Sequence, residues 1–321
     1  MPRLSHLVPM LRLVARGLAA RGEPDLPPQA PRRKPAVERE GIVADPRLVE
    51  RYLRATDGLR LEKLRGADAL LPPVFPATWE TAQTLELLAG LERPLPAGGV
   101  VHQETELLCL RPLAASDVVR CRVELERAER VRRGIRLPVV ARDWTPGGQL
   151  CAQSTAVILA KTRAPAEEHA PGGSRSSTRQ EGDPRAEPPT AWEPVTEWKL
   201  GGDAGRRYAA VSGDYNPIHL WSWTARPFGF RRPILHGYCT QAMVAHALIE
   251  HRLGGDPAAL RRLRIAFRAP LLLPGRARLL AGEKLGQRWF RVVGDDDEKV
   301  FAEGTFAGGS QPPRPHLQLV K

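Results

Sequence analysis

The chain repeats one order of predicted elements in its two halves, and this repeat limits the folds open to it. In each half, hydrophobic spacing predicts a helix, a loop, a second helix and then several strands. The expected helices cover residues 45–58 and 77–90 in the first half and residues 205–214 and 237–253 in the second. The expected strands cover residues 100–113, 117–129, 134–144, 150–161, 260–273, 277–286, 287–294 and 300–308. We therefore expect two similar units in one chain.

Each unit is expected to have an α+β fold, with one central helix wrapped by a curved antiparallel sheet. Small side chains at Ala242, Ala245 and Ala247 let the second-half helix lie close to such a sheet. Two units can also pair edge to edge into one longer sheet, which would cover exposed strand edges. The architecture expected from the pattern is thus a tandem of two wrapped helices.

Composition divides the chain into four segments. Residues 163–194 contain almost no large apolar side chain, which is typical of a flexible linker. The expected division is an N-terminal basic helix with an extended segment (1–36), a first repeat (37–162), the linker (163–194) and a second repeat (195–321).

Residues 1–22 contain no acidic residue, and Arg12 and Arg16 interrupt the apolar run. These charges argue against a secretory signal and against a membrane span. We expect an amphipathic helix whose leucines pack on the protein body, and contact with a membrane surface or a transit role are the alternatives.

The balance of 48 Lys and Arg against 36 Asp and Glu gives a net charge of +12, which suits an anionic partner. The sequence has no zinc-finger spacing and no aromatic signature of an RNA-binding domain, so nucleic acid is not expected. The four cysteines show no CxxC spacing and lie in or beside apolar runs. They indicate buried thiols in a reducing, cytoplasmic compartment, with neither disulfides nor a metal site.

The second half carries a compact chemical motif between Tyr208 and Gly237. Asp214 and His219 lie five residues apart, and Asn216-Pro217 between them predicts a turn. Such a turn can bring a carboxylate and an imidazole to one cavity, as proton transfer to and from a substrate requires. The plainer alternative is that Asp214 only forms the turn. The first half has no counterpart of this motif, so we expect one active site per chain.

The motif resembles that of the MaoC-like, R-specific enoyl-thioester hydratases, which have the hot-dog fold. The residues that carry the resemblance are Tyr208, Ser212-Gly213-Asp214, Asn216-Pro217-Ile218-His219, Gly229-Phe230 and His236-Gly237. The whole chain is similar to the double hot-dog 3-hydroxyacyl-thioester dehydratases of bacterial fatty-acid metabolism. In that family an inactive first repeat helps to shape the acyl pocket.

The resemblance implies a hydro-lyase of the enoyl-CoA hydratase 2 type that needs no cofactor. It would reversibly hydrate trans-2-enoyl thioesters and dehydrate (3R)-hydroxyacyl thioesters, carried on coenzyme A or on acyl carrier protein. The catalytic pair falls on Asp214 and His219, and we assign His219 to the water and Asp214 to the C2 proton. Gly237 is the expected oxyanion donor, because it opens a helix and has no side chain to obstruct the thioester.

Further residues have supporting parts in this hypothesis. Those expected to support the turn are Tyr208, Ser212, Asn216 and His236. Those expected to meet the phosphates of the carrier are Arg231, Arg232 and Arg268. His102, in the first half, is expected to be structural, and Trp221 and Trp223 either border the acyl entrance or cover the core. Pro227 should end or kink the short helix that contains it.

Two other functions remain open at this stage. The chain could be a non-catalytic acyl-thioester-binding or scaffolding protein, although the intact Asp214 and His219 argue against this. It could also be a hot-dog thioesterase that hydrolyses the thioester. The tandem repeat is compatible with a monomer, in which one chain forms a pseudo-dimer, or with a homodimer.

Overall fold

The computed structural model describes residues 34–66, 69–91, 95, 100–131, 134–161 and 187–309. The predicted N-terminal basic helix and residues 163–186 of the predicted linker therefore lie outside the described residues.

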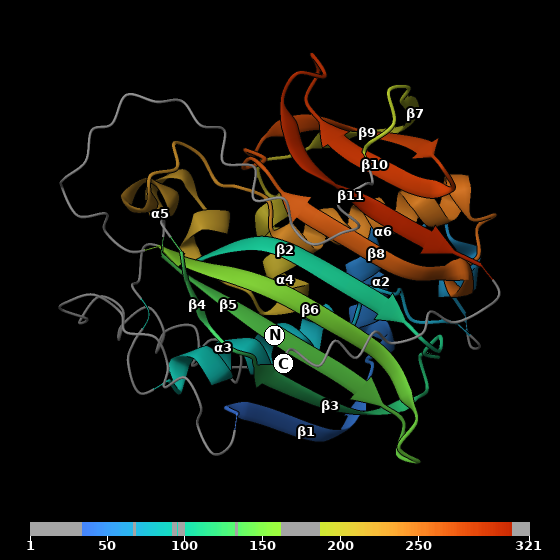
Figure 1. Cartoon of the computed structure of the whole chain (residues 1–321). Coiled ribbons are helices and arrows are strands. Elements are labelled where there is room, and N and C mark those ends of the chain that lie inside the picture. The colour runs from blue at the N-terminus through green and yellow to red at the C-terminus, as the bar shows by residue number, and fades with distance from the viewer. Residues whose placement is uncertain are drawn as a thin grey trace.

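All the strands of the described part join one antiparallel sheet (Figure 1). The first repeat contributes β1 (Ala36–Val43), β2 (Val100–Cys109), β3 (Val118–Leu125), β4 (Glu129–Val131), β5 (Gly134–Trp144) and β6 (Leu150–Lys161). The second repeat contributes β7 (Glu193–Leu200), β8 (Leu260–Phe267), β9 (Gly275–Lys284), β10 (Gln287–Val293) and β11 (Val300–Gly308). Their order is β1-β3-β5-β6-β2-β8-β11-β10-β9-β7, and β4 pairs with β5.

The sheet order shows that the two halves are copies of one unit. The order β1-β3-β5-β6-β2 in the first repeat corresponds to β7-β9-β10-β11-β8 in the second, and the two units meet where β2 pairs with β8. Residues from Glu104 to Leu108 pair with residues from Ala266 to Arg262 across this seam. Edge-to-edge pairing of the two repeats is thus confirmed.

The sequence pattern missed the first strand of each repeat. These strands, β1 and β7, form the two outer edges of the sheet, and most of their residues are exposed or half-buried. An edge strand that carries charges has no clear alternation of apolar and polar residues, so its periodicity is weak. β7 begins at Glu193, within the residues for which composition predicts a linker.

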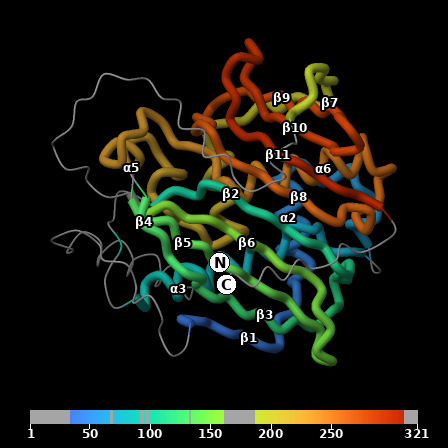
Figure 2. Tube along the Cα trace, viewed as in Figure 1, coloured from blue at the N-terminus to red at the C-terminus, as the bar shows by residue number. Residues whose placement is uncertain are grey.

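The described part of the chain also contains five α-helices, of which two pack on strands of this sheet (Figure 2). They are α2 (Pro46–Ala55), α3 (Ala77–Ala89), α4 (Ala204–Ser212), α5 (Ser222–Ala225) and α6 (Gly237–Arg252). Short 3₁₀ turns follow at η1 (Glu62–Leu64), η2 (Pro217–His219), η3 (Arg226–Phe228) and η4 (Pro257–Ala259). α5 ends before Pro227, which lies in the first turn of η3. In the part of the chain that the structure describes, no helix is long and apolar enough to cross a membrane.

The central helix of the second repeat is buried on nearly every side. Ala242 and Ala245 are fully buried, and Ala247 is almost so. Their small side chains let α6 lie close to the surrounding strands, as the sequence predicts. The hydrophobic core around α6 continues into the first repeat, where Tyr52 and Leu53 of α2 belong to the same cluster of buried side chains.

Matching residues of the two repeats also meet in the core. Tyr52 and Tyr208 are both buried, and their ring centroids lie 6.2 Å apart. Thr56 Oγ1 donates to the carbonyl of Tyr52 at 2.7 Å, and Ser212 Oγ donates to the carbonyl of Tyr208 at 3.0 Å. The same helix-terminal hydrogen bond therefore occurs in α2 and in α4.

The turn that follows α4 packs back on the start of that helix. A Cβ atom placed on Gly205 would lie only 2.1 Å from the carbonyl oxygen of His219. Only glycine therefore leaves room for η2 in its present position.

Replacing Gly205 with alanine should lower the free energy of unfolding by about 1–3 kcal/mol, although alanine favours helix, because the methyl group would overlap a backbone oxygen. Gly202→Ala is a matched control, since a Cβ there would meet only a Pro274 ring carbon at an ordinary 3.7 Å. Urea unfolding of both variants would measure the difference. Equal stability of the two variants would contradict this close packing.

Candidate active site

A cavity of about 460 Å³ is lined by residues of both repeats. Its first-repeat wall comes from α3, β2 and β6 and is mainly apolar, with Leu85, Leu88, Val100, Val101, Ile158 and Leu159. Its second-repeat wall carries the polar groups Asp214, Asn216, His219 and His236 together with Gly237. An apolar cavity with a few converging polar groups is the usual form of a small-molecule site.

Successive side-chain hydrogen bonds build the turn that holds Asp214. Ser212 Oγ accepts from the backbone N–H of Asp214 at 3.2 Å, and Asp214 Oδ1 accepts from the N–H of Asn216 at 3.1 Å. Asn216 Oδ1 in turn accepts from the N–H of Ile218 at 3.3 Å, which starts η2. Asp214 is therefore a turn former that also lines the cavity.

His219, at the end of η2, is buried, and a backbone carbonyl of a nearby loop orients its ring. Its Nδ1 lies 2.8 Å from the carbonyl oxygen of Ile234, so Nδ1 carries the hydrogen and donates it. Burial lowers the pKa of His219, and Asp214 and the carbonyl of Ile234 oppose this shift. The neutral ring then has an unprotonated Nε2, which is the form that a general base needs.

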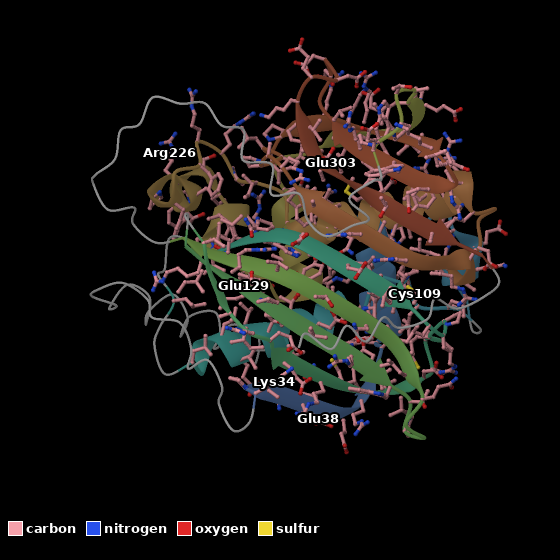
Figure 3. All side chains as sticks on the ribbon, viewed as in Figure 1. Lys34, Glu38, Cys109, Glu129, Arg226 and Glu303 are labelled. Carbon is pink, nitrogen blue, oxygen red and sulfur yellow. The ribbon has the colours of Figure 1, made fainter. Side chains whose placement is uncertain are left out.

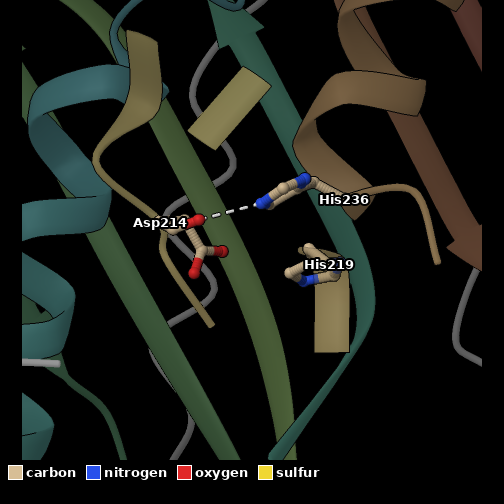
Figure 4. Close-up of side chains that lie close together, drawn as sticks. All are labelled: Asp214, His219 and His236. Carbon is tan, nitrogen blue, oxygen red and sulfur yellow. Dashed lines mark hydrogen bonds between the residues drawn. The ribbon is translucent and has the colours of Figure 1, made fainter. Parts of the chain in front are cut away.

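His236 supports both members of the pair. Its Nε2 donates to the backbone carbonyl of Asp214 at 2.9 Å, and its ring stacks on His219 with centroids 3.7 Å apart (Figure 4). Burial, with a further contribution from His219, lowers the pKa of His236 well below its ordinary value. A neutral ring in this place fixes the backbone of Asp214 and the plane of His219.

Asp214, His219 and His236 place one ligand atom each within 4.8 Å of the others, which raises the question of a metal ion. The two imidazole planes are only 23° apart and are stacked. Imidazole binds a metal through a lone pair in the plane of the ring, and two stacked rings do not direct their lone pairs at one ion. This group is therefore better suited to proton transfer.

Gly237 begins α6 and faces the cavity, where the N–H groups of the first helical turn have no partner within the helix. A Cβ atom on Gly237 would lie 2.8 Å from His102 Nδ1 and 3.0 Å from Phe267 Cζ. His102 and Phe267 thus occupy the space that a side chain would need. This is an additional reason for glycine, which the motif alone did not reveal.

Two supporting residues of α4 lie beneath the turn. Tyr208 is buried, and its ring centroid is 5.0 Å from that of His236. Ser212 is buried as well and contacts the backbone of Asp214. The structure therefore brings together all the residues that the sequence assigns to the catalytic, oxyanion and supporting positions.

The three arginines assigned to phosphate binding are less uniform. Arg268 lines the cavity, but its Nε already donates to Glu303 on β11 at 2.9 Å (Figure 3 labels Glu303). Arg231 and Arg232 are exposed, and neither has an ion pair among the described residues. Arg232 Nη1 donates to the carbonyl of Pro274.

Trp221 and Trp223 are exposed. Their exposed fractions are 44% and 71%, and their rings stack on each other with centroids 6.0 Å apart. Neither side chain belongs to the buried core, and neither lines the cavity.

Comparison with known proteins agrees with this architecture. The model of the MaoC like domain matches residues 180–300. The chain is 32% identical to 3-hydroxyacyl-thioester dehydratase X of Mycobacterium tuberculosis over 283 residues, which are 88% of this chain and 91% of the relative. The crystal structure of that protein, HtdX, superposes with a TM-score of 0.67 and covers 85% of this chain and 100% of HtdX, at 26% identity.

One further relative and one solved structure show how far the likeness extends. Peroxisomal enoyl-CoA hydratase 2 of Arabidopsis thaliana is 45% identical over 53 residues, which are 16% of this chain and 17% of the relative. A conserved hypothetical protein of M. tuberculosis with a double hot-dog fold superposes with a TM-score of 0.55 over 90% of this chain and 96% of its own, at 12% identity. The predicted tandem fold is thus confirmed, and the chain belongs to the MaoC-like dehydratase family of double hot-dog proteins.

Proposed function

We propose that the chain catalyses the reversible hydration of trans-2-enoyl thioesters and the dehydration of (3R)-hydroxyacyl thioesters. The observation that carries this proposal is the pairing of Asp214 with a buried His219 in one largely apolar cavity. The names of the relatives, 3-hydroxyacyl-thioester dehydratase and enoyl-CoA hydratase 2, support the same reaction.

In hydration, a water molecule binds between Asp214 and His219. Nε2 of His219 takes one proton from the water as its oxygen adds to C3, and Asp214 gives a proton to C2. Both groups act from the same side of the alkene, so addition is syn. The pair carries one proton before and after the reaction, and transfer from His219 to Asp214 restores the starting state. In dehydration the two roles reverse.

Negative charge develops on the thioester carbonyl oxygen while C2 is electron-rich. We assign the N–H of Gly237 to this oxygen, because the N-terminus of α6 offers an unpaired donor and the positive end of the helix dipole. Such a donor is most effective when it is fixed before the reaction. The ring of His236 and the bonds through Ser212 and Asn216 hold the rest of the site in place.

A single assay tests the reaction. Purified protein is incubated with a trans-2-enoyl-CoA while the loss of enoyl absorbance and the release of free thiol are followed together. Loss of absorbance without thiol, with a (3R)-hydroxyacyl product, is the expected result. Release of thiol would instead indicate a thioesterase, and no change in either signal would indicate a binding protein.

Asp214→Asn and His219→Gln should each lower kcat for hydration by roughly 10²–10⁴-fold, because each removes a group that moves a proton. Asparagine keeps an oxygen for the N–H of Asn216, so the turn should persist. Because the pair acts as a unit, the double variant should be only slightly slower than the slower single variant. A rate near that of the parent in either single variant, with unchanged thermal unfolding, would contradict the assignment.

The pH dependence follows from the lowered pKa of His219. As the base for water, His219 must be neutral, so protonation on the acid side should stop hydration. The fall in kcat/KM should therefore begin below the ordinary histidine value of about 6.5. This limb reports the pair as a whole, and it should disappear in His219→Gln. An acid limb at or above pH 6.5, measured over a series of overlapping buffers at constant ionic strength, would argue against a buried neutral base.

The carrier of the acyl group brings phosphate to the site. We assign Arg231, Arg232 and Arg268 to these phosphates. Arg231 and Arg232 are exposed in the segment that leads into the site, and Arg268 lines the cavity itself. Either coenzyme A or acyl carrier protein meets this requirement.

All four cysteines are buried free thiols, which supports a cytoplasmic location.

The two exposed arginines can be tested with a truncated substrate. Arg231→Ala and Arg232→Ala should each raise KM for an enoyl-CoA about fivefold, on the order of 1 kcal/mol. They should leave KM unchanged for the N-acetylcysteamine thioester, which has no phosphate. Arg47→Ala, at the start of α2, is the control and should alter neither value. Equal changes with both substrates would rule out a phosphate contact.

A further inference from the structure

The first repeat places a histidine in the active-site cavity. His102 lies on β2 and lines the same cavity as Asp214 and His219, which come from the second repeat. The pairing of β2 with β6 shifts register between His102 and Glu104. Irregularities of this kind often redirect a side chain beside an active site. His102 was not expected in the site, because the sequence around it contains no acidic or nucleophilic companion of the motif type.

The ring of His102 faces the proposed oxyanion donor. A Cβ atom on Gly237 would be 2.8 Å from Nδ1 of His102, so this nitrogen borders the space in front of the first residue of α6. The ring is held between Tyr238, with a centroid distance of 4.6 Å, and Phe267, at 5.0 Å. It is therefore fixed in orientation before a substrate arrives.

The other ring nitrogen already has a partner within the protein. Nε2 of His102 contacts Oγ1 of Thr105, which is buried. The hydroxyl of Tyr238 contacts Thr105 and Ser154, and burial raises the pKa of Tyr238, so the phenol keeps its proton. Tyr238 can thus donate to Thr105, and Thr105 can donate to Nε2. Where Thr105 donates to Nε2 in this way, the hydrogen of the neutral imidazole lies on Nδ1.

The imidazole of His102 is neutral under ordinary conditions. Burial lowers the pKa of His102 to about 4, and the carbonyl of Glu104 and the charge of Asp214, when this side chain is ionised, only partly offset this shift. A neutral imidazole can donate a hydrogen bond to a developing oxyanion and keep its own hydrogen throughout.

We propose that His102 is a catalytic residue supplied by the first repeat, whose Nδ1–H donates to the thioester carbonyl oxygen beside the N–H of Gly237. This inference rests on the proposed hydratase function and extends it. The oxyanion site would then be composite, with one donor from each repeat. The first repeat would contribute chemistry as well as the apolar wall of the pocket.

Three substitutions separate the role of Nδ1 from that of ring volume. His102→Phe keeps a ring but no donor, and kcat for enoyl-CoA hydration should fall about 10²-fold. His102→Asn places an amide near the position of Nδ1 and should recover most of that loss. His102→Gln places its amide near the position of Nε2 and should remain as slow as the phenylalanine variant. His251→Phe, on the exposed end of α6, is the control.

A spectroscopic measurement tests the contact directly. In an Asp214→Asn background, which should hold the enoyl-CoA unreacted, the carbonyl stretch of a ¹³C-labelled thioester is recorded by infrared difference spectroscopy. Adding His102→Phe should move this band towards higher frequency, and adding His102→Asn should return it. Nitrogen-15 NMR of the free protein should show the hydrogen of His102 on Nδ1.

The inference is overturned if His102→Phe leaves both kcat and the carbonyl band unchanged, or if the hydrogen of the free imidazole lies on Nε2. It is equally overturned if the asparagine and glutamine variants lose activity alike. Failure of the proposed function would look different, since the unsubstituted protein would then not hydrate an enoyl-CoA at all. Circular dichroism of each variant identifies any that fail to fold. If His102→Phe fails to fold, the activity and the carbonyl band of His102→Asn test the inference in its place.

Discussion

The pairing of β2 with β8 is the contact on which the rest of the structure depends. It joins the strands of the two repeats into one sheet, with β1 and β7 at the two ends of the strand order. Charged side chains reinforce it: Glu104 of β2 lies near Arg264 of β8, and Arg262 donates to Glu106 at 2.6 Å. Because backbone bonds fix the register of the two strands, the position of one repeat relative to the other is fixed as well.

This seam also creates the site. The cavity takes apolar lining from both repeats, with α3, β2 and β6 forming one wall, and it takes its acid and base from the turn after α4. His102 lies two residues before Glu104, where the pairing of β2 with β8 begins, and Phe267 ends β8. The two side chains that fill the space beside Gly237 therefore come from opposite sides of the seam. A shift of one residue in register would turn them away from the cavity.

Burial has two opposite effects at this site. It lowers the pKa of His102, His219 and His236, which keeps the three imidazoles neutral and able to act as bases or neutral donors. It also imposes a cost on any polar atom without a partner, and Nδ1 of His236 is such an atom. The hydrogen bonds from His236 to the carbonyl of Asp214 and from His219 to the carbonyl of Ile234 fix the orientations of the two rings.

Much of this protein could be predicted from local sequence. The helices and the inner strands follow from apolar spacing, and the turn at Asp214 follows from Asn216-Pro217, because these features depend on near neighbours in the chain. The motif also identified Asp214, His219, His236 and Gly237 as a group. The edge strands β1 and β7, with one face or edge in water, lacked the periodicity that would have revealed them. Only the tertiary structure brought His102 to Gly237, since 135 positions (237 − 102) separate them and their contact depends on a strand pairing that no local pattern specifies.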